Sequence, residues 1–262
     1  MATAATSALR GITLILAGLM PVLALSGLVP ALPQLFQQFA DEPNRELLVP
    51  MIITVPSLCV ALFSGFAGAI ADRWGRRRLL LVSLLAFGAL GTIPMLFSSL
   101  QAILASRVVV GIAEAAILTC ANALLGDYYD EADRRKWLGY QNMFGALFGS
   151  AIILSGGFLA DWHWRAPFLL YLFGFAVFVM AFISCPEPER ARSTGASGSP
   201  SQSAPAAFPW RTVALVCSVT LGLSLIYYVQ AVQHGRIFGD MGVDSPARIS
   251  ILVTIASMGT IL

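Results

Sequence analysis

The residues of this sequence that could do chemistry in an apolar environment are two charged side chains in one apolar segment, Arg107-Val-Val-Val-Gly111-Ile-Ala-Glu114. Positions i, i+4 and i+7 lie on one face of a helix, so Arg107, Gly111 and Glu114 share a stripe about 10 Å long. A charged side chain at the centre of a bilayer costs about 2.5–3.5 kcal/mol on insertion scales, and such residues normally face a cavity. We expect Arg107 and Glu114 to do so; the alternative is a structural ion pair inside a helix bundle.

A second charged feature is a short turn between two long apolar runs, Gly68-Ala-Ile-Ala-Asp72-Arg73-Trp74-Gly75-Arg76-Arg77-Arg78. Gly68 allows close approach of another helix, and Asp72 can pair with an arginine or with a helix N-terminus. Gly75 allows a tight turn. The three arginines after it are expected to face anionic lipid headgroups. The alternative is an ordinary basic turn.

The composition indicates that these charges are set in an integral membrane protein. The chain is 57% hydrophobic and 11% charged, whereas soluble domains are about 45–50% apolar and about 25% charged. A net charge of +2 gives no indication of a nucleic-acid partner. The four cysteines stand singly, without the Cys/His spacing of a metal site, so no metal or cofactor is expected.

Apolar runs long enough to cross a bilayer recur along the chain, and a spanning helix needs about 20 such residues. They lie at about 11–35, 48–71, 79–98, 101–125, 138–159, 167–184 and 211–232. An eighth begins near Ile249 and is still apolar at Leu262. Lipid offers no partner to unpaired backbone groups, so these spans must be helices.

The placement of lysine and arginine predicts a cytoplasmic N-terminus. Eleven basic residues lie on the N-terminal side of the predicted membrane: Arg10, Arg73, Arg76, Arg77, Arg78, Arg134, Arg135, Lys136, Arg190, Arg192 and Arg211. Four lie on the other side: Arg45, Arg165, Arg236 and Arg248.

A change in composition near residue 186 divides the chain. Residues 186–210 are rich in Ser, Gly, Ala and Pro and predict a cytoplasmic linker between a six-helix bundle, residues 1–185, and the start of a second bundle, residues 211–262. The six-helix part contains a faint repeat. Gly68-x-x-x-Asp72 ends span 2 and Gly157-x-x-x-Asp161 ends span 5, on opposite sides of the membrane, as inverted three-helix repeats would produce.

Three motifs resemble those of the major facilitator superfamily of membrane transporters. G-x-x-x-D-x-x-G-R-R at 68–77 resembles the signature loop between helices 2 and 3, and Arg107-x-x-x-Gly111 resembles the signature on helix 4. Residues 111–115 also resemble the G-x-G-E-A run of organic-anion symporter and spinster-like branches, with Ala113 at the second glycine. The small residues of span 5 that resemble the third signature are Gly145, Gly149, Gly156 and Gly157.

The resemblance implies an all-α membrane fold, namely a six-helix N-terminal bundle of inverted three-helix repeats, plus helix 7 and part of helix 8. It implies that Gly68, Asp72, Gly75, Arg76 and Arg77 act as a conformational latch against helix 11 in the outward-open state. Gly111, Gly149, Gly156 and Gly157 are expected to be sites of close helix packing. In the family, helices 1, 4, 7 and 10 line the cavity, so Tyr227, Tyr228 and Gln230 are candidate substrate contacts; the alternative is an interfacial aromatic belt.

We therefore expect secondary active transport of a small organic solute by alternating access, as a symporter or antiporter in the cytoplasmic (inner) membrane, and no enzymatic activity. Proton coupling is expected, with Arg107 and Glu114 in the translocation path and Glu114 exchanging the proton. One alternative is a drug efflux antiporter, although Ile152-Ile153 stands where such antiporters usually carry Gly-Pro. Another is a truncated fragment that transports nothing, since the missing C-terminal helices are needed for a complete transporter.

Overall fold

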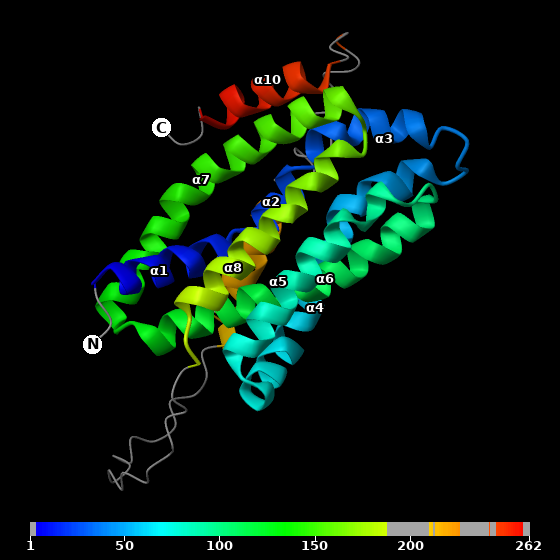
Figure 1. Ribbon diagram of the computed structural model, residues 1–262. Helices are drawn as coiled ribbons and strands as arrows, with labels where there is room; N and C mark the ends of the chain where they lie inside the picture. The colour runs from blue at the N-terminus through cyan, green and yellow to red at the C-terminus, as the bar shows by residue number, and fades with distance from the viewer. Residues whose placement is uncertain (1–3, 188–209, 212, 226–240, 242–244, 259–262) are drawn as a thin grey trace, which may run out of the picture.

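The computed structural model describes residues 4–187, 210–211, 213–225, 241 and 245–258, and its regular structure in those ranges is entirely helical. The helices are α1 (Ala4–Gly18), α2 (Met20–Ser26), α3 (Leu32–Gln38), α4 (Arg45–Trp74), α5 (Arg76–Thr92), α6 (Leu100–Tyr128), α7 (Glu131–Trp162), α8 (Phe173–Ser184) and α10 (Pro246–Met258). Three short 3-10 turns join them: η1 (Val29–Ala31), η2 (Ile93–Met95) and η3 (Ala166–Leu172). Figure 1 shows the order of these elements along the chain.

In the part of the chain that the structure describes, six helical segments are long and apolar enough to cross a membrane, which confirms the first six predicted spans. They are Thr6–Gln38, Arg45–Trp74, Arg76–Met95, Leu100–Tyr128, Glu131–Trp162 and Ala166–Ser184. The first is broken into α1, α2, η1 and α3, with proline in the first turn of each of the last three pieces. Proline has no N–H to give to the preceding turn, so a break at these positions is expected.

The predicted spans at about 101–125 and 138–159 left the charged segment between them outside the helices, and these helix ends were placed too early and too late. Helix α6 continues to Tyr128 and α7 begins at Glu131, so only two residues join them. The carboxylate of Asp130 accepts a hydrogen bond from the Asp133 backbone N–H at 2.8 Å and caps α7. Acidic residues at the start of a helix stabilise its exposed N–H groups, so the helix extends beyond the apolar run that defined the predicted span.

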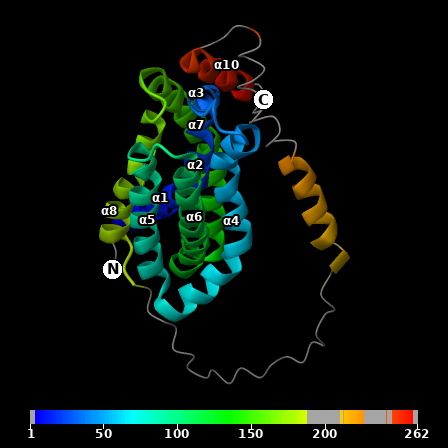
Figure 2. The same ribbon diagram turned by 90° about the vertical axis from the view of Figure 1, so that its right-hand side faces the viewer.

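Helix α6 is the centre of the bundle. It packs along α4 and α5 and also contacts α1, and its buried residues occur on most of its circumference. Figure 2 shows α4 and α5 on either side of α6. Two of its charged side chains, Arg107 and Glu114, are buried in the protein interior, whereas Asp127 in its last turn is exposed.

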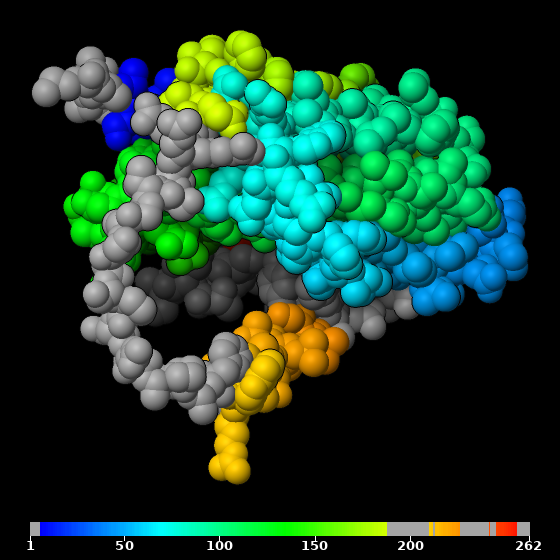
Figure 3. All heavy atoms as spheres, turned by 90° about the horizontal axis from the view of Figure 1, so that it is seen from below, coloured from blue at the N-terminus to red at the C-terminus, as the bar shows by residue number. Residues whose placement is uncertain are grey.

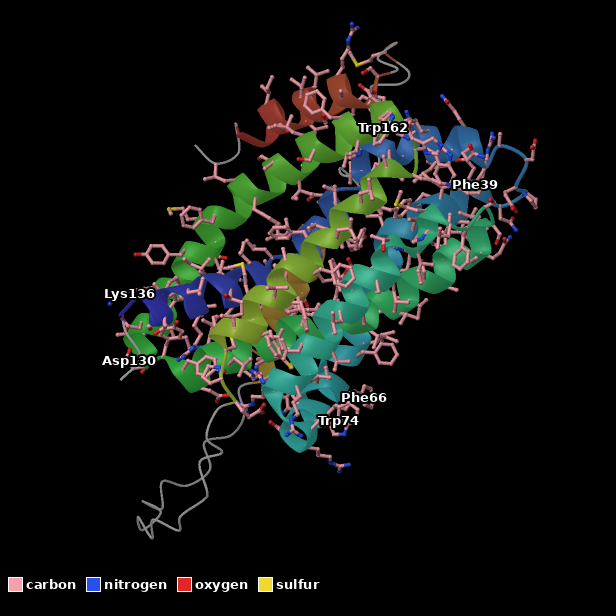
Figure 4. The ribbon with its side chains drawn as sticks, viewed as in Figure 1. Phe39, Phe66, Trp74, Asp130, Lys136 and Trp162 are labelled. Atoms are coloured by element: carbon pink, nitrogen blue, oxygen red, sulfur yellow. The ribbon has the colours of Figure 1, made fainter. Side chains whose placement is uncertain are left out.

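The two ends of the bundle carry different elements. The start of α1, the turn between α4 and α5, the turn between α6 and α7 and the end of α8 lie at one end, which we call the basic end because Arg76, Arg77 and Arg78 are there (Figures 1 and 4). At the opposite end α10 begins beside the last turns of α7. From there α10 runs back along α7 and packs against it (Figure 1).

The apolar helix Val213–Leu225 stands away from the bundle and is exposed along nearly its whole length (Figures 2 and 3). It falls in the predicted seventh span, 211–232, of which residues 226–232 lie outside the described part of the chain. Most of the predicted linker, 186–210, also lies outside it.

Candidate functional site

Arg107 lies completely buried about two turns from the start of α6. Its Nη2 donates a hydrogen bond to the backbone oxygen of Gly91 on α5 at 3.0 Å. The centre of its guanidinium group lies 5.2 Å from the ring of Phe168 and 4.8 Å from the ring of Tyr171, both on η3. Cation–π contacts of this kind are worth about 2 kcal/mol or more when they are desolvated. Arg107 is therefore held between α5, α6 and η3, in the interior of the six-helix bundle.

The aromatic side of this pocket depends on a glycine. A Cβ atom at Gly91 would overlap the ring of Tyr171, so only glycine lets the tyrosine lie flat against α5. The hydroxyl of Tyr171 donates in turn to the backbone oxygen of Ala24 on α2 at 3.3 Å. These contacts fix the ring that stacks on Arg107.

Glu114 lies two turns further along the same stripe of α6 and is 1% exposed. Its Oε1 has no hydrogen-bond partner, and neither has Nη1 of Arg107. Within the described residues, no ion pair of 4.0 Å or less joins Arg107 and Glu114. The stripe therefore holds two buried charged side chains that do not neutralise each other directly, which is costly unless one of them changes its charge.

Gly111, between the two charged residues, is a point of close approach between α4 and α6. A Cβ atom there would lie 2.6 Å from Cβ of Cys59 and 2.7 Å from both Cα and the backbone oxygen of Pro56. Because part of the obstacle is backbone, no side-chain rotation could relieve the overlap. The environment of Glu114 is thus linked to the position of α4.

At the basic end, Arg76 joins three helices. Its Nη1 lies 2.6 Å from Oδ1 of Asp127 on α6, and its Nη2 lies 3.2 Å from Oδ1 of Asp72 on α4. All three side chains are partly exposed, so each pair contributes about 0.2–1 kcal/mol. Gly75, just before Arg76, has φ of 100°, a backbone conformation that favours glycine.

Arg77 and Arg10 donate hydrogen bonds to the backbone carbonyl groups at the carboxyl-terminal end of α8. Arg77 Nη2 donates to the Phe182 oxygen at 3.1 Å and Nε donates to the Cys185 oxygen, while Arg10 Nε donates to the Ser184 oxygen at 3.1 Å. The last carbonyls of a helix have no partner within it. The prediction that Arg76 and Arg77 face lipid headgroups was therefore wrong, because the guanidinium groups of both residues are directed at protein acceptors. Arg78, the third arginine of the turn, is exposed.

The other predicted site residues fall into three groups. Gly149, Gly156 and Gly157 lie at helix contacts, with Val22, Gly27 and Ser250 respectively as the nearest neighbours of an added Cβ. Gly68 has nothing closer than Cγ2 of Thr119, at 3.8 Å, so its close approach to another helix stays a prediction. The candidate substrate contacts Tyr227, Tyr228 and Gln230 lie outside the described residues.

Sequence reasoning missed the residues that surround Arg107. Gly91 is 16 positions before it in the chain, and Phe168 and Tyr171 come from a different span. The available signal was general: a buried guanidinium needs acceptors and aromatic faces. The sequence does not say which of its many glycines and aromatic residues supply them.

The described residues thus form a bundle of six membrane-length helices with two charged side chains, Arg107 and Glu114, buried inside it. The chain belongs to the Major Facilitator Superfamily, because the sequence profile of this family matches residues 14–262. This family consists of membrane transporters.

Curated relatives of the chain are exporters and resistance proteins by name. The chain is 27% identical over 162 residues to the tetracycline resistance protein, class H, of Pasteurella multocida, which covers 60% of this chain and 39% of that protein. It is 26% identical over 208 residues to the multidrug efflux pump LfrA of Mycolicibacterium smegmatis, covering 78% of this chain and 38% of the pump. The chain thus spans less than half the length of these relatives.

Two solved structures have the same fold. A bacterial homologue of the human lysosomal transporter Spinster, in an inward-facing and unoccupied conformation, matches with a TM-score of 0.75 and 20% identity, over 99% of this chain and 62% of that one. A D-xylose–proton symporter matches with a TM-score of 0.66 and 16% identity, over 96% of this chain and 65% of that one. At these identities the likeness establishes the fold and not the substrate.

Proposed function

We propose that this chain acts in the secondary active transport of a small organic molecule across the cytoplasmic membrane by alternating access, coupled to protons. The observation that carries the proposal is Glu114, a buried carboxyl with an unpartnered oxygen at the centre of a superfamily bundle. An ionised carboxylate without a partner is costly to bury, so this side chain is the group best suited to take up and release a proton. The predominance of basic residues at the basic end supports a cytoplasmic position for that end and for the N-terminus.

The route by which proton binding would act on the fold runs through Gly111. Helix α4 touches α6 with its backbone at this residue, one turn before Glu114. Protonation of Glu114 removes its negative charge and its attraction to Arg107, which is strong in a low-dielectric interior. A change in the packing of α4 against α6 would then accompany each proton transfer, with Arg107 kept in place by Gly91, Phe168 and Tyr171.

Alternating access also requires that one end of the protein close while the other opens. At the end opposite the basic end, the Ser245 hydroxyl donates to the Asp161 carboxylate at 3.0 Å, and Gly157 lets α10 approach α7. The Ser245–Asp161 hydrogen bond and the approach of α10 to α7 support closure at the end opposite the basic end.

A drug efflux antiporter is a second candidate function. It is favoured by the names of the curated relatives, which include tetracycline resistance proteins and multidrug pumps. Ile152-Ile153, at the place where the resemblance predicts Gly-Pro, counts against it. The direction of transport discriminates between the two, because an efflux antiporter accumulates cationic dyes inside inverted vesicles while protons leave.

The experiment is a proton-flux assay on the purified 262-residue chain in liposomes that contain a pH-sensitive dye. Organic acids and cationic dyes are added in turn, and the wild type is compared with Glu114→Gln. The matched control is Glu131→Gln, an exposed acid that pairs only with Arg135 within the described residues. We expect one compound to drive a proton flux in the wild type and the control but not in Glu114→Gln.

Equal flux in Glu114→Gln would remove this residue from the mechanism. A wild-type chain that moves neither solute nor protons with any compound would favour the remaining alternative, that the chain does not transport on its own.

A further inference from the structure

The basic end has a groove that the transport mechanism does not use. It lies between the end of α4 and the first turns of α5, has a volume of about 540 Å³, and is lined by Arg73, Trp74, Arg78, Leu81 and Val82. Trp74 and Val82 are 63% and 54% exposed. Figure 4 shows Trp74 near the end of α4, at the basic end of the bundle, and Figure 3 shows that end with the α4–α5 turn in front.

The charge of the groove is positive. Two guanidinium groups line it and no carboxylate does. Arg76 and Arg77, the neighbours in sequence, are directed away to Asp127, Asp72 and the carbonyls of α8. For the exposed Arg78, no hydrogen bond or ion pair is found within the part of the chain that the structure describes.

The groove is charged at the membrane surface and apolar deeper in the membrane. Leu81 and Val82 follow Arg78 by one turn of α5, so they lie about 5 Å deeper in the bilayer than the start of the guanidinium side chain. Trp74 is the last residue of α4 and lies at the turn before α5, and tryptophan is enriched at membrane interfaces. A ligand that fits must therefore have an anionic group at the surface and an apolar chain below it.

We propose that this groove binds one anionic phospholipid of the surrounding leaflet. Its phosphate lies beside Arg78 and Arg73, and an acyl chain lies along Trp74, Leu81 and Val82. The binding of this lipid is independent of the proposed transport activity, because it requires only that the six helices cross a membrane.

The test uses quenching of Trp74 fluorescence by lipids with brominated acyl chains. The 262-residue chain is placed in phosphatidylcholine bilayers that contain increasing fractions of brominated phosphatidylglycerol or brominated phosphatidylcholine, and Trp74→Phe identifies the part of the signal that Trp74 gives. Each arginine near the surface favours an anionic lipid about fivefold. We therefore expect phosphatidylglycerol to quench Trp74 at a several-fold lower mole fraction than phosphatidylcholine.

Three variants assign the preference to the groove. Arg78→Gln lowers the preference about fivefold, Arg78→Lys keeps it, and Arg135→Gln, which removes an exposed arginine from the same end, leaves it unchanged. Equal quenching of Trp74 by the two lipids overturns the proposal. An equal loss of the phosphatidylglycerol preference in Arg78→Gln and Arg135→Gln also overturns it, because such a loss is a general effect of surface charge. Loss in Arg78→Lys, or displacement of the lipid by millimolar glycerol 3-phosphate, overturns the assignment of a lipid to this site.

Discussion

The contact between α4 and α6 at Gly111 leads to a prediction that tests the packing around Glu114. Gly111→Ala adds one methyl group, whose carbon would lie 2.6 Å from Cβ of Cys59. Carbon atoms in contact are normally about 3.5–4.0 Å apart, so α4 must move away by about 1 Å. Overpacking of this kind costs about 1–3 kcal/mol.

The matched control is Gly65→Ala on α4. An added Cβ at Gly65 would have nothing within 4 Å. Alanine favours a helix over glycine by about 0.8–1.0 kcal/mol, so this control is expected to be neutral or slightly stabilising. The helix preference acts on both variants and cancels, so they should differ by about 1–3 kcal/mol in the free energy of unfolding, which is the overpacking cost alone.

Two measurements follow the change: unfolding in detergent by increasing dodecyl sulfate, and the rate at which a maleimide reacts with Cys59. Cys59 is 6% exposed, and displacement of α4 should speed its reaction several-fold. The exposed Cys217 is first replaced by serine so that it does not dominate the signal. Cys185 should react with the maleimide only slowly, because burial raises the pKa of its thiol and lowers the fraction of reactive thiolate.

If Gly111→Ala unfolds at the same denaturant concentration as the wild type and Cys59 stays unreactive, the close approach of the two helices does not exist in the protein. Equal destabilisation by Gly65→Ala would also contradict the reasoning, because it would mean that any added methyl group on these helices is harmful.

Three further predictions concern charged residues. Arg76→Gln and Asp127→Asn, measured singly and together in a double-mutant cycle, should give a coupling of about 0.2–1 kcal/mol that falls in high salt, because the pair is partly exposed; a coupling near zero at low salt would contradict the contact. Arg107→Met should lower the free energy of unfolding by about 2 kcal/mol or more, because it removes the desolvated cation–π contacts with Phe168 and Tyr171; unfolding at the same denaturant concentration as the wild type would show that these contacts do not stabilise the fold. Asp161→Asn should weaken the hydrogen bond from Ser245 and increase the labelling of a cysteine placed at the buried position 247, whereas unchanged labelling would exclude this contact from closure.

The sequence predicted the spans because their signal is local. Each apolar run is long enough to specify a helix by itself, and the turn at Gly75 is specified by a glycine followed by charged residues. The helix ends were less predictable. Charged residues such as Asp130 and Glu131 were assigned to a loop, although outside the hydrocarbon layer they can continue or cap a helix.

The surroundings of the buried charges could not be predicted from the sequence. The i, i+7 spacing put Arg107 and Glu114 on one stripe but did not show which neighbouring helix that stripe faces. The structure directs Arg107 toward Gly91 and Tyr171, in the interior of the bundle. Such contacts depend on how separate spans pack, and packing between helices is not encoded in the period of any one of them.

The most direct test of the central claim, that Glu114 exchanges the coupling proton, is an infrared difference spectrum of the chain in lipid between acidic and alkaline buffer. The carbonyl stretch of a protonated carboxyl group is distinct from the bands of carboxylates. We predict a protonated-carboxyl band that is present in the wild type and in Glu131→Gln, is absent in Glu114→Gln, and changes in intensity when the transported compound is added. Identical spectra for the wild type and Glu114→Gln would contradict the claim.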